Sequence, residues 1–154
     1  MKVKVDRIIN NEQEESANLK IFEITPNIEN AIALLQNENY IIEAENIDEG
    51  SFEKLKFSQI IYVEYLERNI YLYTADTAYS VHGSLTNFMK NAPNSFIQIS
   101  KSVMVNLYFM QSFAAQNNGN LVAEMASNEK LIVSRRYVKK LKDKLAEISK
   151  NNRM

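Results

Sequence analysis

The sequence predicts a mainly β domain, α+β once its helices are counted, and three observations support this fold class. Short runs rich in Ile, Val, Tyr and Phe are separated by turn signals about every eight to twelve residues, as in antiparallel sheets. The stretch 96–107, FIQISKSVMVNL, alternates apolar and polar residues, which is typical of strands with one buried and one wet face. The chain has 154 residues, of which 45% are hydrophobic, so it can bury the core of one domain.

The first fifty residues predict a small strand-helix-strand extension. Residues 2–9 alternate weakly, as an edge strand would, and residues 19–24 predict another strand. Thr25-Pro26 predicts the start of a helix, because a hydroxyl can cap the first turn and proline is tolerated there. The helix is expected to end within 37–39, before a strand at 40–45.

The turn-like stretch NIDEGS, residues 46–51, is the candidate boundary between this extension, residues 1–50, and a larger domain, residues 51–154. Charge changes across this boundary. Residues 1–50 hold four Lys/Arg against eleven Asp/Glu, a net charge of −7, and residues 51–154 hold fourteen against eight, a net charge of +6. The basic part suggests a polyanionic partner. A solvated basic helix is an equally good explanation, because eight of the fourteen cations follow Ser134.

The larger domain is denser in strand patterns and ends in a helix. The polar pair Arg68-Asn69 separates two apolar runs and predicts a hairpin. Ser84 and Ser134 precede apolar residues at helical spacing and are expected to cap helices. In chain order we expect strands at 57–65, 70–74 and 78–81, a helix after Ser84, strands at 96–107, 108–114, 121–125 and 130–133, and a closing helix after Ser134.

Little in the sequence supports catalysis. The chain has no cysteine, which excludes disulfides, thiolate metal sites and a cysteine nucleophile. The only histidine, His82, stands beside Gly83 and fits a turn better than a catalytic base. Three glycines are too few for a glycine-rich phosphate loop, and no acidic cluster has metal-ligand spacing. We therefore expect neither an enzyme nor a cofactor or metal.

The hydrophobic pattern also bears on location. No apolar run approaches the roughly 18 residues of a membrane span. The N-terminal stretch lacks the apolar core of a signal peptide. A soluble cytoplasmic protein is the expectation.

Cationic and hydroxyl side chains gather at three predicted loops or helix starts. Arginine can bond guanine O6 and N7 together, while lysine and serine suit phosphates or single base edges. Short loops at one end of a rigid sheet could present such residues on one face; the alternative is an ordinary set of polar turns. The candidate DNA-binding residues are Arg68 and Asn69 at the hairpin tip, Ser100, Lys101 and Ser102 in the central stretch, and Arg135 and Arg136 at the last helix.

Two stretches carry a resemblance to a known family. FIQISKSVMVNL, followed by NGNLVAEMASNEKLIVSRRYVKKLKDKL, resembles the LytTR DNA-binding domain family, whose pattern is F-x-x-I-x-[KR]-S-x-x-V-N, a glycine turn, L-x-I-S-R-R and a closing helix. Upstream, IIYVEYLERNIYLYT and YSVHGSLTNFMKNAP resemble the earlier hairpin and helix of that family. The resemblance runs from about Phe57 to Leu145. Where the family often has histidine before [KR]-S, this chain has Ser100.

The resemblance implies an elongated stack of small antiparallel sheets with a C-terminal helix. It implies loops, rather than a recognition helix, in successive major grooves of double-stranded DNA, with Arg68 or Asn69, Lys101 and Arg136 entering them. The family usually carries a receiver domain, for which fifty residues are too few. The chain is similar to the stand-alone branch, which tends to be encoded beside an inhibitory membrane protein. The extension would then serve dimerisation or that partner.

The leading hypothesis is a bacterial transcription regulator that binds specific double-stranded DNA, as a homodimer on repeated half-sites. The rival is a protein-interaction module that antagonises a related regulator without binding DNA. Salt distinguishes the two, because DNA affinity falls steeply with salt for the regulator and is absent for the module.

Overall fold

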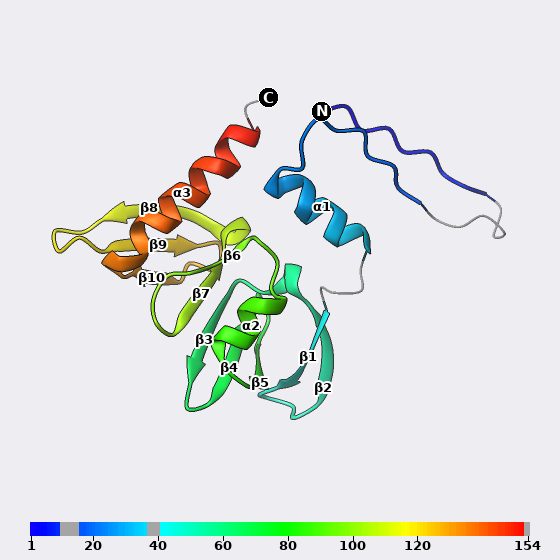
Figure 1. The fold of residues 1–154 in the computed structure, drawn as a ribbon. Coiled ribbons are helices and arrows are strands. Elements are labelled where there is room, and N and C mark those ends of the chain that lie inside the picture. The colour runs from blue at the N-terminus through cyan, green and yellow to red at the C-terminus, as the bar shows by residue number, and fades with distance from the viewer. Residues whose placement is uncertain (10–15, 37–40, 153–154) are drawn as a thin grey trace.

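The computed structural model describes residues 1–9, 16–36 and 41–152, and in this part it contains ten strands in two antiparallel sheets and three α-helices (Figure 1). The mainly β fold with a C-terminal helix is confirmed. The larger sheet has the order β2-β1-β5-β4-β3-β7-β6, and the smaller has the order β10-β9-β8. The elements are α1 (Pro26–Gln36), β1 (Ile41–Asn46), β2 (Phe52–Lys56), β3 (Tyr62–Leu66), β4 (Asn69–Tyr73), β5 (Ala78–His82), α2 (Leu85–Asn91), β6 (Phe96–Gln98), β7 (Val103–Asn106), β8 (Met110–Ala115), β9 (Leu121–Met125), β10 (Lys130–Val133) and α3 (Arg135–Asn152), with 3₁₀ turns at Phe57–Gln59 and Leu107–Phe109.

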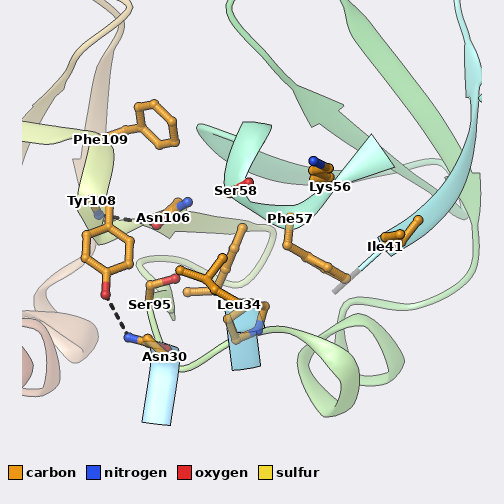
Figure 2. A pocket seen from close by; sticks show the side chains of 12 residues that line it. Asn30, Leu34, Ile41, Lys56, Phe57, Ser58, Ser95, Asn106, Tyr108 and Phe109 are labelled. Carbon is orange, nitrogen blue, oxygen red and sulfur yellow. Dashed lines mark hydrogen bonds between the residues drawn. The ribbon is translucent and has the colours of Figure 1, made fainter. Parts of the chain in front are cut away.

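Helix α1 begins where its capping residue predicts. The Ile28 amide donates to the Thr25 hydroxyl over 3.3 Å, which satisfies one of the N–H groups left open at a helix start. The helix contacts α3, and Asn30 connects it to the sheet domain, since its Nδ2 donates to the Tyr108 hydroxyl over 2.9 Å (Figure 2). The predicted helix end at 37–39 lies outside the described residues.

The strands predicted at 2–9 and 19–24 are wrong. Neither segment has regular structure, and most of its side chains are exposed, among them Val5 and Phe22. An alternating pattern makes a strand only when another strand offers backbone partners. The strand predicted at 40–45 is observed as β1, and it pairs with β2 and β5. It therefore belongs to the larger sheet, although it precedes the predicted boundary at residues 50 and 51.

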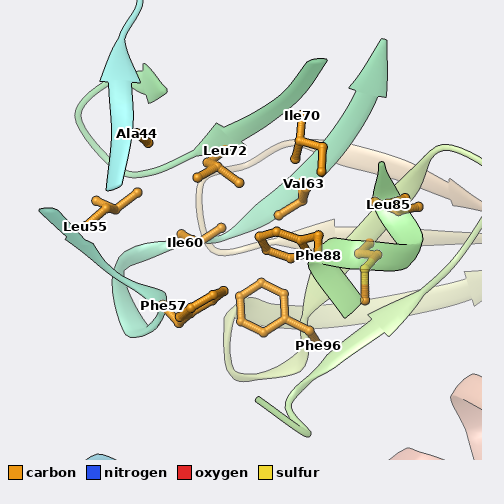
Figure 3. Packing of buried hydrophobic residues seen from close by; sticks show 11 residues of the cluster. Ala44, Leu55, Phe57, Ile60, Val63, Ile70, Leu72, Leu85, Phe88 and Phe96 are labelled. Atoms are coloured by element: carbon orange, nitrogen blue, oxygen red, sulfur yellow. The ribbon is translucent and has the colours of Figure 1, made fainter. Parts of the chain in front are cut away.

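One hydrophobic core lies between the larger sheet and α2 (Figure 3). Its centre is a trio of rings, with Phe88 and Phe96 each packed against Phe57 at centroid separations of 5.6 and 5.9 Å. Helix α2 is held in place by Ser84, whose hydroxyl accepts from the Asn87 amide over 3.2 Å, as the sequence predicts. The aromatic trio fixes the start of β6 against α2 and the 3₁₀ turn after β2.

A second core joins the two sheets to α3. Tyr62 of β3 and Val105 of β7 face this core together with Ala123 of β9 and Leu141 of α3. Their neighbours along the same strands face the first core, so β3 and β7 are buried on both sides. Burial on both faces makes these two strands the rigid centre of the molecule.

The expected wet face of residues 96–107 is therefore wrong. Met104 and Asn106 alternate with the predicted apolar residues, yet they are 2% and 1% exposed. Met104 packs in the α2 core. The Asn106 amide is satisfied, since its Nδ2 donates to the Ile60 carbonyl over 3.0 Å and its Oδ1 accepts from the Tyr108 amide over 3.2 Å.

Candidate nucleic-acid interface

The β3–β4 hairpin carries the first predicted cation at its tip. Leu66 pairs with Asn69, so the loop has two residues, Glu67 and Arg68, at φ values of +49° and +68°. Positive φ at both positions is the geometry of a type I′ turn. The turn lies one residue earlier than the sequence predicts. Arg68 is exposed, whereas Asn69 starts β4 and its Oδ1 lies 3.1 Å from His82 Nδ1.

The β6–β7 loop carries the second cation. Ile99 is fully buried, and its amide donates to the Val103 carbonyl over 2.9 Å, which closes the loop tightly. The Ser102 amide donates to the Ser100 hydroxyl over 3.4 Å, so the serines shape the loop around the exposed Lys101. The loop lies at a sheet end with its lysine outward, as predicted.

The start of α3 carries two more cations. The Arg135 amide donates to Asn120 Oδ1 over 3.0 Å, so a side chain from the β8–β9 turn satisfies the helix terminus. Gly119, at φ +87°, packs on the stem of Arg135; a Cβ there would lie 2.8 Å from Arg135 Cδ. Arg135 and Arg136 are both exposed at this terminus.

Two backbone hydrogen bonds tie these three places together. The Tyr65 amide, near the end of β3, donates to the Ser102 carbonyl over 2.7 Å. The Ser134 amide, just before α3, donates to the Ile99 carbonyl over 2.9 Å. Because β3 is antiparallel to β7 and β7 to β6, the hairpin tip and the β6–β7 loop lie at the same end of the larger sheet. Figure 1 shows the tip, the loop and the start of α3 along one side of the molecule.

We call this surface the cationic flank, and it consists of Arg68, Lys101, Arg135 and Arg136. Within the described residues, none of these cations has a carboxylate within ion-pair distance. The ion pairs found there are elsewhere, between Lys4 and Asp6 and between Lys144 and Glu147. Unpaired exposed cations can meet an external anion without first breaking an internal ion pair.

The sequence model described as the LytTr DNA-binding domain matches residues 50–146, which include the whole cationic flank. The chain belongs to the LytTr DNA-binding domain family.

Relatives and a solved structure agree with this membership. Two Staphylococcus aureus proteins, from strains NCTC 8325 and MRSA252, are 27% and 26% identical over 92 residues, which cover 60% of this chain and 63% of theirs. Both are named uncharacterized HTH-type transcriptional regulators. The LytTr DNA-binding domain of a Bacillus cereus protein, described as a methyl-accepting/DNA response regulator, superposes with a TM-score of 0.63 at 20% identity, covering 69% of this chain and 96% of that one.

This LytTr domain contains no helix-turn-helix in its described part, despite the names of its relatives. Helices α1, α2 and α3 are separated from one another by strands. The residues at the cationic flank come from a hairpin, a loop and a helix start instead.

Two residues near the flank were not predicted from the sequence to lie there. His82 is exposed at the end of β5, opposite Asn69, at the same sheet end as Arg68. Asn120 caps α3 from a turn fifteen residues earlier. Ser134, predicted as the cap, stands directly before α3, and its carbonyl accepts from the Tyr137 amide as that of a residue at this position does. Neither His82 nor Asn120 has a local sequence signal, because the first is placed by the pairing of β4 with β5 and the second reaches α3 across the fold.

A pair of tyrosines in the LytTr domain lies at the end of the β3–β4 pair opposite the hairpin tip. Tyr62 and Tyr73 stack with ring centroids 4.3 Å apart, and the Tyr73 hydroxyl donates to Glu64 Oε2 over 3.4 Å. Burial, together with the negative charge of Glu129, raises the pKa of Tyr62 to about 12. Burial and the neighbouring Glu64 also raise the pKa of Tyr73. Both phenols are therefore neutral at physiological pH.

The described residues hold no cluster of three or more His, Cys, Asp or Glu side chains suited to a metal ion. None of the helices described here combines the length and hydropathy needed to cross a membrane.

Proposed function

We propose that this LytTr chain is a bacterial transcription regulator that binds specific double-stranded DNA sequences through the cationic flank. The observation that carries the proposal is the arrangement of the flank, where three separate turns of a rigid scaffold place unpaired cations on one side. Family membership supports DNA as the partner. The relatives' names support a regulatory role, and the chain matches 63% of their length.

Phosphate neutralisation would supply most of the affinity. Exposed lysines and arginines release counterions from DNA when they contact phosphates. Arg135 and the hydroxyls of Ser100 and Ser102 suit this role, because they border the two turns that approach the duplex. Contacts of this kind set the register of the protein on DNA without reading its sequence.

Base recognition would come from Lys101, Arg136 and Arg68, one from each turn. Each can donate to guanine in a major groove, and arginine can do so through two bonds at once. Arg68 is a better candidate than Asn69 at the hairpin tip, because the Asn69 carboxamide already interacts with His82. Three turns along one flank would enter successive major grooves.

We further propose that the chain acts in the cytoplasm as a homodimer and that a co-encoded membrane protein restrains it. Residues 1–50 are the candidate contact surface for either partner. Apolar side chains that would favour association are exposed there, among them Val3, Val5, Phe22 and Leu35.

The proposal is tested by selecting bound fragments from genomic DNA and measuring their affinity by fluorescence anisotropy as salt is raised. The expected result is one enriched sequence and an affinity that falls linearly on a logarithmic scale, with a slope of about −0.9 per phosphate contacted. No enrichment and no binding at low salt would contradict the proposal and favour a module that only binds protein.

A further inference from the structure

A cavity of about 230 Å³ lies between α1 and the sheet domain, at the opposite end of β6 and β7 from Lys101 (Figure 2). We call it the α1 cavity. Its walls are mainly apolar and come from Leu34 of α1, Ile41, Phe57, Phe96 and Phe109. It is open beside Leu34, whose side chain is 56% exposed although it lines the cavity.

The size and walls of the cavity suit a small ring-containing molecule. An apolar cavity of roughly 150 Å³ in another protein stays dry and binds benzene. The α1 cavity is larger, and aromatic side chains of three separate segments surround it. Water would find few polar partners against these walls, so an apolar ligand is favoured over solvent.

One hydroxyl of the cavity wall makes no side-chain hydrogen bond within the part of the chain that the structure describes. Ser95 is only 4% exposed and lines the cavity, and none of the side-chain hydrogen bonds among the described residues uses its hydroxyl. The neighbouring Asn30 and Tyr108 are bonded to each other instead. Among the described residues no buried side-chain polar atom lacks a partner, so the Ser95 hydroxyl is accessible from the cavity, where a ligand with one polar group can hydrogen-bond it.

The cavity is also connected to the cationic flank. Phe96 begins β6, which leads directly into the Ser100–Ser102 loop, and Asn106 ends β7, which leads out of it. β6 is the edge strand of the larger sheet, so a ligand that shifts Phe96 would move the loop that carries Lys101. Helix α1 forms the remaining wall, so binding would also fix the position of the N-terminal extension.

We propose that the α1 cavity binds a small molecule of one or two apolar rings with a single hydroxyl or carbonyl group, and that this molecule is an effector of DNA binding. The effector role rests on the proposed function, whereas the binding site does not. The polar group of the ligand hydrogen-bonds the Ser95 hydroxyl, and its rings lie against Phe57, Phe96 and Leu34.

The site is tested by calorimetric titration of the intact chain with 2-naphthol, a two-ring phenol. Saturable binding is expected. Leu34→Trp fills the cavity and should weaken binding by at least about tenfold. The matched control is Leu35→Trp, because Leu35 is 60% exposed on the same helix but does not line the cavity. Ser95→Ala should weaken binding by about two- to tenfold through the lost hydrogen bond. Absence of saturable binding, or equal binding by both tryptophan variants, would overturn the site.

The effector role is tested by repeating the DNA titration with 2-naphthol at saturation. A change in DNA affinity of about fivefold or more is expected for the parent chain and for Leu35→Trp, and none for Leu34→Trp. Saturable 2-naphthol binding with unchanged DNA affinity would overturn the effector role. If the chain bound no DNA at all, the proposed function would fail, and calorimetry would still decide the site.

Discussion

At the scale of single residues, two neighbouring cations of the flank are expected to contact different parts of the DNA, one a base and the other a phosphate. Arg135 and Arg136 are adjacent and both exposed, but they occupy consecutive positions of a helix start and so face different directions. Gly119 packs on the stem of Arg135, which fixes that side chain against the β8–β9 turn. Under the proposed function, Arg136 is the candidate for a base contact and Arg135 the candidate for a phosphate contact.

Replacing Arg136 with alanine should cost about 1–3 kcal/mol of binding free energy at the base pair it contacts. The loss should disappear on DNA in which that base pair has been changed, because the contact is then already missing. Arg135→Ala is the control, and it should weaken binding to both DNAs equally and reduce the salt slope by about one. Anisotropy titrations on both DNAs make the comparison. An equal loss for Arg136→Ala on both would assign it to a phosphate.

The neutral Tyr62 makes the stability of the fold depend on alkaline pH. Its pKa is about 12 in the folded chain and 10.0 when unperturbed, so the folded state holds this proton more tightly. The stabilisation is fully present below pH 10 and is lost as pH rises toward 12.

Tyr62→Phe should therefore reduce the fall in the free energy of unfolding between pH 10 and about 12. Part of the fall should remain, because the pKa of Tyr73 is also raised. Urea unfolding followed by circular dichroism at several pH values measures it. An identical pH dependence in both proteins would show that the Tyr62 phenol ionises equally in the folded and unfolded chain.

At the scale of elements, those with local chemical signals are the ones the sequence predicts. The caps at Thr25 and Ser84 are found where expected, because a hydroxyl three residues before an amide needs no distant partner. The prediction of strands at 2–9 and 19–24 is wrong because the alternating pattern is read from neighbouring residues, whereas a strand also needs a partner strand from elsewhere in the chain. The wet face of 96–107 fails because α2 covers it, which depends on Phe88 meeting Phe57 across the fold.

In the β3–β4 hairpin, a single change is expected to raise the stability of the fold and to weaken DNA binding. Glu67 and Arg68 both adopt positive φ without glycine, which is strained for such residues. Replacing them with Asn-Gly, the preferred type I′ pair, should raise the free energy of unfolding by about 1 kcal/mol. The same change removes the Arg68 cation and should weaken DNA binding. Thermal unfolding and anisotropy measure the two effects, and a more stable variant with unchanged DNA affinity would remove Arg68 from the interface.

At the scale of the whole molecule, the flank and the α1 cavity are both assembled from distant parts of the chain. The segments that carry residues 68, 101 and 136 are joined by two backbone hydrogen bonds that no sequence pattern encodes. The sequence predicted a shared side from short loops at one end of a rigid sheet and from the family resemblance, but not the bonds that join them. The cavity draws on residues from 30 to 109 and depends on where α1 attaches, so it had no sequence signal.

The most direct test of the central claim compares two double variants on the selected DNA. Lys101→Ala/Arg136→Ala removes two cations of the flank. Lys54→Ala/Lys90→Ala removes as much charge from the edge strand β2 and from the end of α2, away from the flank. Circular dichroism confirms that both variants remain folded. We expect the first to lose at least about tenfold in affinity and the second to lose far less, because its cations lie off the contact surface. Undiminished binding by Lys101→Ala/Arg136→Ala, or equal losses in both, would contradict a DNA-binding flank.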